Sequence, residues 1–489
     1  MYMNKKEPKG SFLIAFVNYA IEKVIENNSC AVYNTDIDQK RREKMVNIKV
    51  DFSKNIGKIK PMHGVGQPPM KGLSLEHFEY LREAAIPFSR LHDVAIPYGG
   101  FRFVDIPNIF RDFDADVNDA ASYDFAFTDW LIKSLYEFGC APVFRLGVSI
   151  ENFIEIRSYR TDPPKDYEKW AAVCEHIIRH YNEGWADGFC YGIEYWEIWN
   201  EPEFHPAKEK NQMWTGSADD YYRLYSVTAK HLKKCFGDSI KIGGYGSCGF
   251  TQALNFPEKY RLDCEKRDYP FENVQYAIDF FYGFFDHLKK TGTPIDFFSW
   301  HSYLSVKDVE IMADFARREL DSLGFEKTEI HLNEWNNAAW VKGSKGTSFA
   351  SAAAAAMMCA MQKKPINVCC YYDAELSISD YAGLFNPLTL KPFCTYYAFK
   401  AFGELYKLEN EVECMSDNKD IYALAAENGD KKAVFVVNVS GNDAVIKTEL
   451  SKNFDIYLIN EQNMMEKAPL CSENFILGDN TAVLLKNYD

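Results

Sequence analysis

Apolar and polar positions form a repeating pattern between residues 58 and 405. A short run rich in β-branched and aromatic residues ends in a polar or glycine cluster, and a longer stretch of helical periodicity follows it. Eight such runs occur, at 58–66, 87–93, 141–147, 195–202, 241–246, 296–303, 328–335 and 367–374. Eight strand-then-helix units predict an α/β fold, the (β/α)8 TIM barrel.

The stretches between the runs carry helix signals of their own. Apolar residues recur at i, i+4, i+7 and i+8 from Trp170 within 165–181, which is typical of a helix with one buried face. The stretch 347–362 is rich in Ala and Met, which favour helix. Ser217 before Asp219 marks a further helix start, because an acidic first turn suits the helix dipole.

An open doubly wound sheet is the alternative fold. Its first strand would be followed by a glycine-rich phosphate loop. The segment HGVGQPP at 63–69 has two glycines, but it lacks the G-x-G-x-x-G spacing and its prolines oppose a helix start. The sequence therefore favours the closed barrel.

After about residue 405 the apolar period changes to two, as in strands. Two strand-like runs flank Asn428-Gly429, which is a strong hairpin signal. We therefore expect a C-terminal all-β (β-sandwich) accessory domain. The predicted organisation is an N-terminal extension at 1–45 that could be helical, a strand at 46–57 joining the β domain, the barrel at 58–405 and the β-sandwich at 406–489.

The N-terminal stretch has two interpretations. Lysines precede the apolar run SFLIAFVNYAI, as in a signal peptide, but Asn18 and Tyr19 interrupt the run and Glu22 follows it. An amphipathic helix lying on the body of the protein fits better. No run reaches the ~18 apolar residues that span a bilayer.

Composition narrows the partners. The net charge is −15, so the surface as a whole repels nucleic acid and anionic membranes, and a neutral small molecule is the easier partner. The 13 cysteines are scattered without a C-x-x-C pair, as expected of reduced thiols in a cytoplasmic protein. His176 and His180 lack the Glu of a metalloprotease helix. We expect neither a metal nor a cofactor.

Polar side chains gather where the predicted strands end. Active sites of such barrels lie at the carboxyl ends of the strands, so this polar crown predicts a site. The residues that end the strands are His63, Arg90, His92, Asp93, Arg145, Asn200, Glu201, Tyr245, His301, Tyr303, Asn333, Glu334, Asp373 and Glu375.

Two carboxylates in this crown have similar surroundings. Glu201 and Glu334 each follow an Asn and lie within two residues of a Trp in the sequence. Facing carboxylates perform glycoside hydrolysis, in which one protonates the leaving oxygen and the other attacks the sugar or activates water. A single Glu at a strand end is more often an ion-pair partner, but two in matching contexts favour catalysis.

The motifs WEIWNEPEF, FFSWHSY and EIHLNEWN resemble those of the clan A glycoside hydrolases. The likeness is greatest to family 39, which contains β-xylosidases and α-L-iduronidases, and it covers about residues 58–405. KIKPMHGVGQPP is similar to the first strand of that family, and GLFNPLTLKPFCTYYAFKAF is similar to its last barrel turn. Gly66 and Gln67 depart from the family pattern, which has a pair of Asn there.

The resemblance implies a retaining, double-displacement mechanism. Glu201 matches the acid/base of the family, Glu334 matches its nucleophile, and Asn200 matches the residue that hydrogen-bonds the sugar 2-OH. The other residues expected to bind substrate are His301, Tyr303, His63, His92, Trp335 and Asp373. Asn333 stands where a Thr or Ser often precedes the nucleophile.

These features predict a retaining exo-glycosidase that hydrolyses terminal β-xylosides of small xylo-oligosaccharides. One alternative keeps the mechanism on another glycone, such as an α-L-iduronide, for which Arg90 and Arg145 could hold the carboxylate, or an α-L-arabinopyranoside. A second alternative is a carbohydrate-binding barrel without catalysis. Trp214, Tyr221 and Tyr222 are either aglycone platforms or helix packing. A homo-oligomer is compatible with the sequence.

Overall fold

The structure is a computed structural model. It describes residues 45–70, 74–92, 94, 104–149, 161–269, 272–450, 453–469 and 474–489. The predictions made for residues 1–44 and for Asp93 lie outside the described residues. Among the helices within the described ranges, every one is too short or too polar to cross a membrane.

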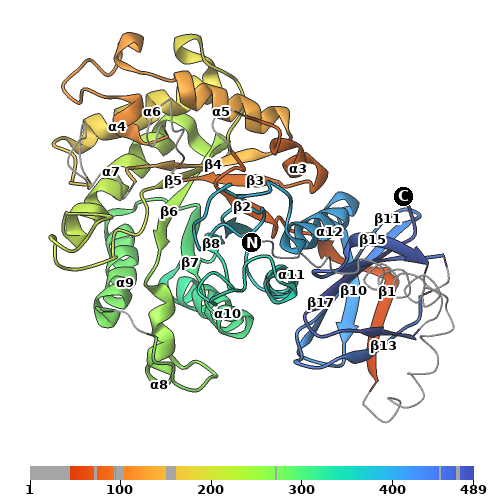
Figure 1. The fold of residues 1–489 in the computed structure, drawn as a ribbon. Helices are drawn as coiled ribbons and strands as arrows, with labels where there is room; N and C mark the ends of the chain where they lie inside the picture. The colour runs from red at the N-terminus through yellow and green to blue at the C-terminus, as the bar shows by residue number, and fades with distance from the viewer. Residues whose placement is uncertain are drawn as a thin grey trace, which may run out of the picture.

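Eight parallel strands close into a barrel, and each pairs with its neighbours in chain order (Figure 1). The predicted barrel is therefore confirmed. The strands are β2 (Gly64–Gly66), β3 (Phe88–Leu91), β4 (Ala141–Leu146), β5 (Tyr195–Ile198), β6 (Lys241–Ser247), β7 (Phe297–Ser302), β8 (Glu329–Trp335) and β9 (Val368–Tyr372). The first is shorter than predicted and begins only after His63.

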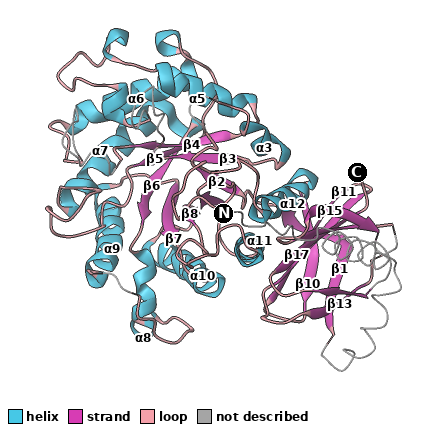
Figure 2. Cartoon of the chain, viewed as in Figure 1, coloured by secondary structure: helices cyan, strands magenta, loops and turns pink. Residues whose placement is uncertain are grey.

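Helices surround the barrel on its outside (Figure 2). The longer ones follow the strands as the apolar pattern predicts. In chain order the helices are α3 (Phe78–Glu83), α4 (Ile106–Ile109), α5 (Ala126–Glu137), α6 (Tyr167–Glu183), α7 (Ala218–Phe236), α8 (Pro257–Tyr260), α9 (Val274–Thr291), α10 (Val306–Leu323), α11 (Ser348–Gln362) and α12 (Cys394–Leu408).

The start of α7 shows how local sequence sets these boundaries. The Ser217 hydroxyl accepts from the backbone N–H of Asp220, and the Asp220 carboxylate accepts from the backbone N–H of Ser217. This reciprocal capping satisfies two donors that a helix start otherwise leaves unpaired. The helix predicted from Ser217 thus begins one residue later.

The second unit is all β and consists of one nine-stranded sheet that curls around a core of its own. Its strand order is β15-β14-β17-β12-β11-β10-β1-β13-β16. The strands are β1 (Val46–Lys58), β10 (Asn410–Ser416), β11 (Ile421–Asn428), β12 (Lys431–Asn438), β13 (Ala444–Thr448), β14 (Asp455–Ile459), β15 (Met464–Pro469), β16 (Asn474–Leu477) and β17 (Thr481–Lys486).

Strand β1 hydrogen-bonds to β10 on one side and to β13 on the other, although it precedes the barrel in sequence. In Figure 1 it lies among the strands of the chain's C-terminal part. The hairpin β11–β12 turns at Gly429 with Asn428 opposite Lys431. The residue limits predicted for the N-terminal extension, the barrel and the β domain remain predictions.

The two units share a core. Along β12, Ala433, Phe435 and Val437 belong to the large apolar cluster of the barrel, whereas Val434 and Val436 belong to the core inside the curled sheet. Successive side chains of a strand point to opposite faces, so one face of β12 packs against α11 and α12. The apolar contact joins the sheet firmly to the barrel.

Replacing Phe435 with Ala tests this shared core. The side chain is fully buried, so we expect the free energy of unfolding to fall by about 3–5 kcal/mol. Met415→Ala is the control, because Met415 lies in the same sheet and is largely exposed. Denaturant unfolding of both variants is the measurement, and an equally small loss in both would contradict the shared core.

Candidate active site

The barrel interior changes from apolar to polar along its axis. Val143, Tyr195, Phe297, Val368 and Cys370 form an apolar cluster inside the barrel. Two residues further along their strands, Arg145, Glu197 and Ser299 follow. Because residues two apart on a strand face the same side, the polar layer stands on the apolar one towards the carboxyl ends of the strands.

A fully buried ion pair fills the centre of the polar layer. Arg90 Nε donates to Glu197 Oε2 at 2.8 Å, while Ser299 Oγ and Asn333 Nδ2 both donate to Glu197 Oε1 at 2.6 Å. Burial alone would raise the pKa of Glu197, but the Arg90 charge and the Ser299 hydrogen bond outweigh burial and hold that pKa below its usual value. Glu197 therefore stays ionised beneath the site.

The same arginine reaches Glu334. Arg90 Nη1 lies 3.2 Å from Glu334 Oε2, and Tyr303 Oη donates to Glu334 Oε1 at 2.5 Å. Each oxygen of this carboxylate thus has its own donor. Arg90 meets it through a single nitrogen and not as a two-pronged pair, so Glu334 is oriented without being enclosed by the guanidinium.

The end of β5 leaves regular strand geometry. Trp199 and Glu201 both have positive φ, at 72° and 49°. Such angles are strained for large side chains and are typical of functional sites. The Trp199 ring packs against Trp170 and Trp214, and the Glu201 N–H donates to Tyr245 O at 3.0 Å. These contacts hold the turn that carries Asn200 and Glu201.

His301 joins the two carboxylates. Its Nδ1 lies 2.6 Å from Glu201 Oε1 and 3.6 Å from Glu334 Oε2. Burial lowers the pKa of His301 to about 4, so the ring is neutral at neutral pH. The short contact to Glu201 is therefore a hydrogen bond with one shared proton. One oxygen of each carboxylate and the His301 nitrogen lie within 4.8 Å of one another.

Three other predicted residues lie around this pair. Asn200 Oδ1 accepts from Arg90 Nη2 at 2.6 Å. His92 follows β3 and is buried, with its ring near that of Tyr372. Asp373 follows β9, where burial and then the Glu375 charge raise its pKa well above the usual range.

Two predicted binding residues lie elsewhere. His63 precedes β2 at its amino end, where its Nε2–H donates to Ala85 O and its ring packs against Phe402 of α12, so the structure does not bring it to the two carboxylates. Trp335 packs against Tyr371 and Phe399 on the helical side of β8. It points away from the barrel interior, which corrects its predicted role.

The remaining candidates serve structure. Arg145 is fully buried and pairs with Asp105 at 2.6 Å. Trp214, Tyr221 and Tyr222 are buried against neighbouring helices and the turn after β5, so helix packing is the right interpretation for these three rings.

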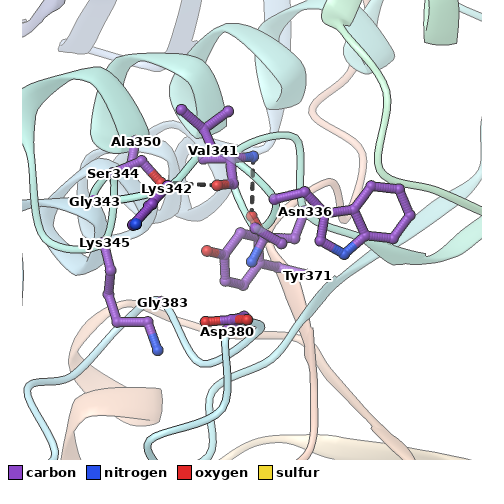
Figure 3. Close-up of a pocket in the computed structure, with 13 residues that line it drawn as sticks. Asn336, Val341, Lys342, Gly343, Ser344, Lys345, Ala350, Tyr371, Asp380 and Gly383 are labelled. Carbon is purple, nitrogen blue, oxygen red and sulfur yellow. Dashed lines mark hydrogen bonds between the residues drawn. The ribbon is translucent and has the colours of Figure 1, made fainter.

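Sequence reasoning missed an aromatic rim beside Glu334. Trp340 stacks on Tyr303 with ring centroids 4.8 Å apart and is 65% exposed, and Tyr381 packs against Tyr303 at 5.2 Å. Trp340 belongs to the loop between β8 and α11, which lines a pocket together with Tyr371 and Asp380 (Figure 3). A Trp in the loop after the strand of Glu334 was the available signal.

Among the residues that the structure describes, two clusters have the right atoms for a metal ion. They are Glu201, His301 and Glu334 in the site, and Glu175, His231 and Cys235 between α6 and α7. In the first, Arg90 already supplies a positive charge to Glu334. In the second, Glu175 pairs with Arg179 and with His231. Both clusters are hydrogen-bonded within the protein as they stand.

A closed (β/α)8 barrel with facing carboxylates at the ends of its fourth and seventh strands defines the clan A class of glycoside hydrolases. The sequence pattern of the glycosyl hydrolases family 39 matches residues 47–377. The chain belongs to that family.

Curated relatives are similar at low identity. A β-xylosidase of Caldicellulosiruptor saccharolyticus is 24% identical over 319 residues, which cover 61% of this chain and 57% of the relative. A β-xylosidase of Geobacillus stearothermophilus is 26% identical over 187 residues, 33% of this chain and 34% of the relative. The matches thus span about half or less of each relative.

Solved structures share the fold over most of the chain. A glucosidase from Croceicoccus marinus has a TM-score of 0.71 and 18% identity, covering 90% of this chain and 98% of that one. A monomeric β-xylosidase from Caulobacter crescentus has a TM-score of 0.62 and 14% identity, covering 90% and 99%. At these identities the likeness shows the fold alone.

Removing the Glu197 carboxylate tests the buried ion pair. Glu197→Ala leaves Arg90 as a buried charge with less compensation, so we expect a loss of about 3–5 kcal/mol in the free energy of unfolding. The matched control is Glu79→Ala, which breaks the exposed pair with Arg82 and should cost less than about 1 kcal/mol. Similar losses in both variants, measured by denaturant unfolding, would contradict a structural role for the pair.

Proposed function

We propose that the protein is a retaining exo-glycosidase that hydrolyses terminal β-xylosides, with Glu334 as nucleophile and Glu201 as acid/base. The observation that carries the proposal is the separation of these two groups, whose nearest oxygens lie within 4.8 Å. Retaining enzymes hold the two carboxyl groups about 5–5.5 Å apart, whereas inverting enzymes leave about 6.5–9.5 Å for a water molecule.

The first step joins the sugar to Glu334. A carboxylate oxygen of Glu334 attacks the anomeric carbon while the proton of Glu201 passes to the leaving oxygen. Tyr303 and Arg90 hold the nucleophile at its two oxygens, which fixes its direction of attack. His301 holds one oxygen of Glu201 and so aims the acid.

The second step returns both residues to their starting state. Glu201, now ionised, takes a proton from water, and the resulting hydroxide displaces Glu334 from the anomeric carbon. Two displacements at one carbon restore the original anomer. The imidazole of His301 stays neutral in both steps, because burial lowers its pKa to about 4.

The charges around the site favour a neutral glycone over a uronic acid. Arg90 pairs with Glu197 and Glu334, and Arg145 pairs with Asp105. Both arginines that could have held a substrate carboxylate are thus engaged within the protein. Xylose, as the particular neutral sugar, is proposed from the names of the two β-xylosidase relatives, and the exo mode is proposed from the resemblance of the sequence motifs.

Gln67 is a further contact for the glycone. It follows β2, its side chain is buried, and Oε1 has no hydrogen-bond partner among the described residues. A buried amide oxygen without a partner is costly, and a sugar hydroxyl would satisfy it. This position is one at which the sequence departs from the family pattern, so it belongs to the determinants of the sugar.

Replacing the two carboxylates tests the mechanism. Glu334→Ala should abolish turnover of 4-nitrophenyl β-xyloside, since no nucleophile remains. Glu201→Gln should still form the glycosyl-enzyme with this leaving group, which needs no proton, and added azide should then yield the β-azide. Product anomers are followed by NMR, with exposed Glu76→Gln as the control.

Three outcomes separate the alternatives. Full activity of either variant on xylobiose would contradict the assignment. Turnover of another aryl glycoside in preference to the xyloside would keep the mechanism and change the sugar. Calorimetric binding of xylo-oligosaccharides without hydrolysis by the wild type would favour a binding protein.

The exposed Trp340 should bind a second sugar ring of the substrate. Its indole has an exposed face beside the nucleophile. Because stacking on an aromatic ring contributes about a factor of ten to binding, we expect Trp340→Ala to raise KM for xylotriose about 10-fold. KM for the aryl xyloside should change less, and Trp340→Phe should recover part of the loss. Ile378→Ala is the exposed control, and equal effects on both substrates would contradict the stacking role.

A further inference from the structure

A third carboxyl group lies directly behind the proposed acid/base. Glu203 follows Glu201 by two residues and is fully buried. Its Oε1 accepts from Ser247 Oγ at 2.6 Å and from the Gly249 N–H at 3.0 Å. Its Oε2 has no hydrogen-bond partner among the described residues. An ionised carboxylate with one oxygen lacking a hydrogen bond is costly in free energy at a fully buried position.

The groups that face Glu203 offer it no positive charge. Among the described residues, the titratable groups with a recorded charge interaction with Glu203 are Glu201, Tyr221, Tyr222, Tyr245, Cys248 and Tyr276. Within the described residues none of these is a cation, and Glu201 is an acid. Burial above all, with a smaller part from the Glu201 charge, raises the pKa of Glu203 to about 7. Its carboxyl group therefore carries a proton below that pH.

The segment that Glu203 holds touches the catalytic residues. Ser247 is the last residue of β6 and Gly249 lies in the bend that follows, and Gly246 precedes them with φ of 62°. A Cβ placed on Gly246 would lie 3.0 Å from His301 Nε2 and 3.2 Å from Asn200 Oδ1. The backbone there is thus in close contact with His301, which holds Glu201, and with Asn200, which accepts from Arg90, so a shift of this segment would displace both side chains.

We propose that neutral Glu203 is a positioning residue that clamps the segment 246–249 against His301 and Asn200, and that its ionisation, which forces Oε2 to find water or a new donor, displaces this segment and limits activity at alkaline pH. This inference rests on the proposed function. Once ionised, the carboxylate would need water or a new donor at Oε2, and reaching either requires this closely packed segment to move.

Glu203→Gln isolates the proton, because the amide keeps an accepting oxygen for Ser247 and Gly249 but cannot ionise. We expect the alkaline limb of kcat for 4-nitrophenyl β-xyloside to move upward by about half a pH unit or more, with KM unchanged. Glu203→Ala removes the clamp and should lower kcat at every pH by about 10- to 100-fold. Rescue by Gln and not by Ala is the signature of positioning by a neutral group.

A second measurement does not depend on activity. A carboxyl group whose folded pKa is raised stabilises the fold fully below its ordinary pKa of 4.5, and this stabilisation is lost as the pH rises through about 7. Thermal unfolding of the wild type should show this loss between these values, and Glu203→Gln should show less of it. If the wild type hydrolyses no glycoside, the proposed function fails, while this comparison still decides whether Glu203 holds its proton.

Glu411→Gln is the matched control. Glu411 is also buried, burial also raises its pKa, and it accepts from Gln362 Nε2 at 2.6 Å in the β unit. Its pH–kcat profile should equal that of the wild type. Coincident alkaline limbs for wild type and Glu203→Gln would overturn the proposal, and so would a downward shift, which would mean that ionised Glu203 assists Glu201.

Discussion

The pair formed by Arg90 and Glu197 is the constraint on which the site depends. Both groups are fully buried, and such a pair is stable only when its hydrogen bonds are complete. Completing them requires Ser299 of β7, Asn333 of β8 and Asn200 in the turn after β5. The hydrogen bonds that these two buried charges need therefore connect the strands that carry Glu201 and Glu334. In addition, Arg90 Nη1 contacts Glu334 and orients it.

The eight strands, the order of helices and the two carboxylates could be predicted from the sequence, because periodicity and strand-end chemistry are local signals. The side-chain directions could not. Asn333 and Glu334 are consecutive, yet both contact residues of the site, because β8 has irregular pairing between Leu332 and Trp335. A bulge breaks the alternation of faces, and Trp335 therefore points outward against expectation.

The other misses have similar causes. No local signal predicts that β2 has only three residues, so the pattern wrongly puts His63 at the carboxyl end of a strand, whereas its ring packs on α12. Trp340 lies in a loop, where the spacing of apolar residues does not predict which way a side chain points. Nothing in the segment NEPEF distinguishes Glu203 from an ordinary exposed acid. Its burial away from positive charge depends on α7, β6 and α9, which are distant in sequence.

The common core of the curled sheet and the barrel has a consequence for how the molecule can be divided. Helix α11 follows the strand of Glu334, and its Ala and Met side chains are buried between that barrel and the sheet. Cutting the chain after α12 would expose a continuous apolar surface next to the strand that carries Glu334. The isolated barrel would then be prone to aggregate. The C-terminal sheet is therefore part of the same folding unit as the barrel and not a separable module.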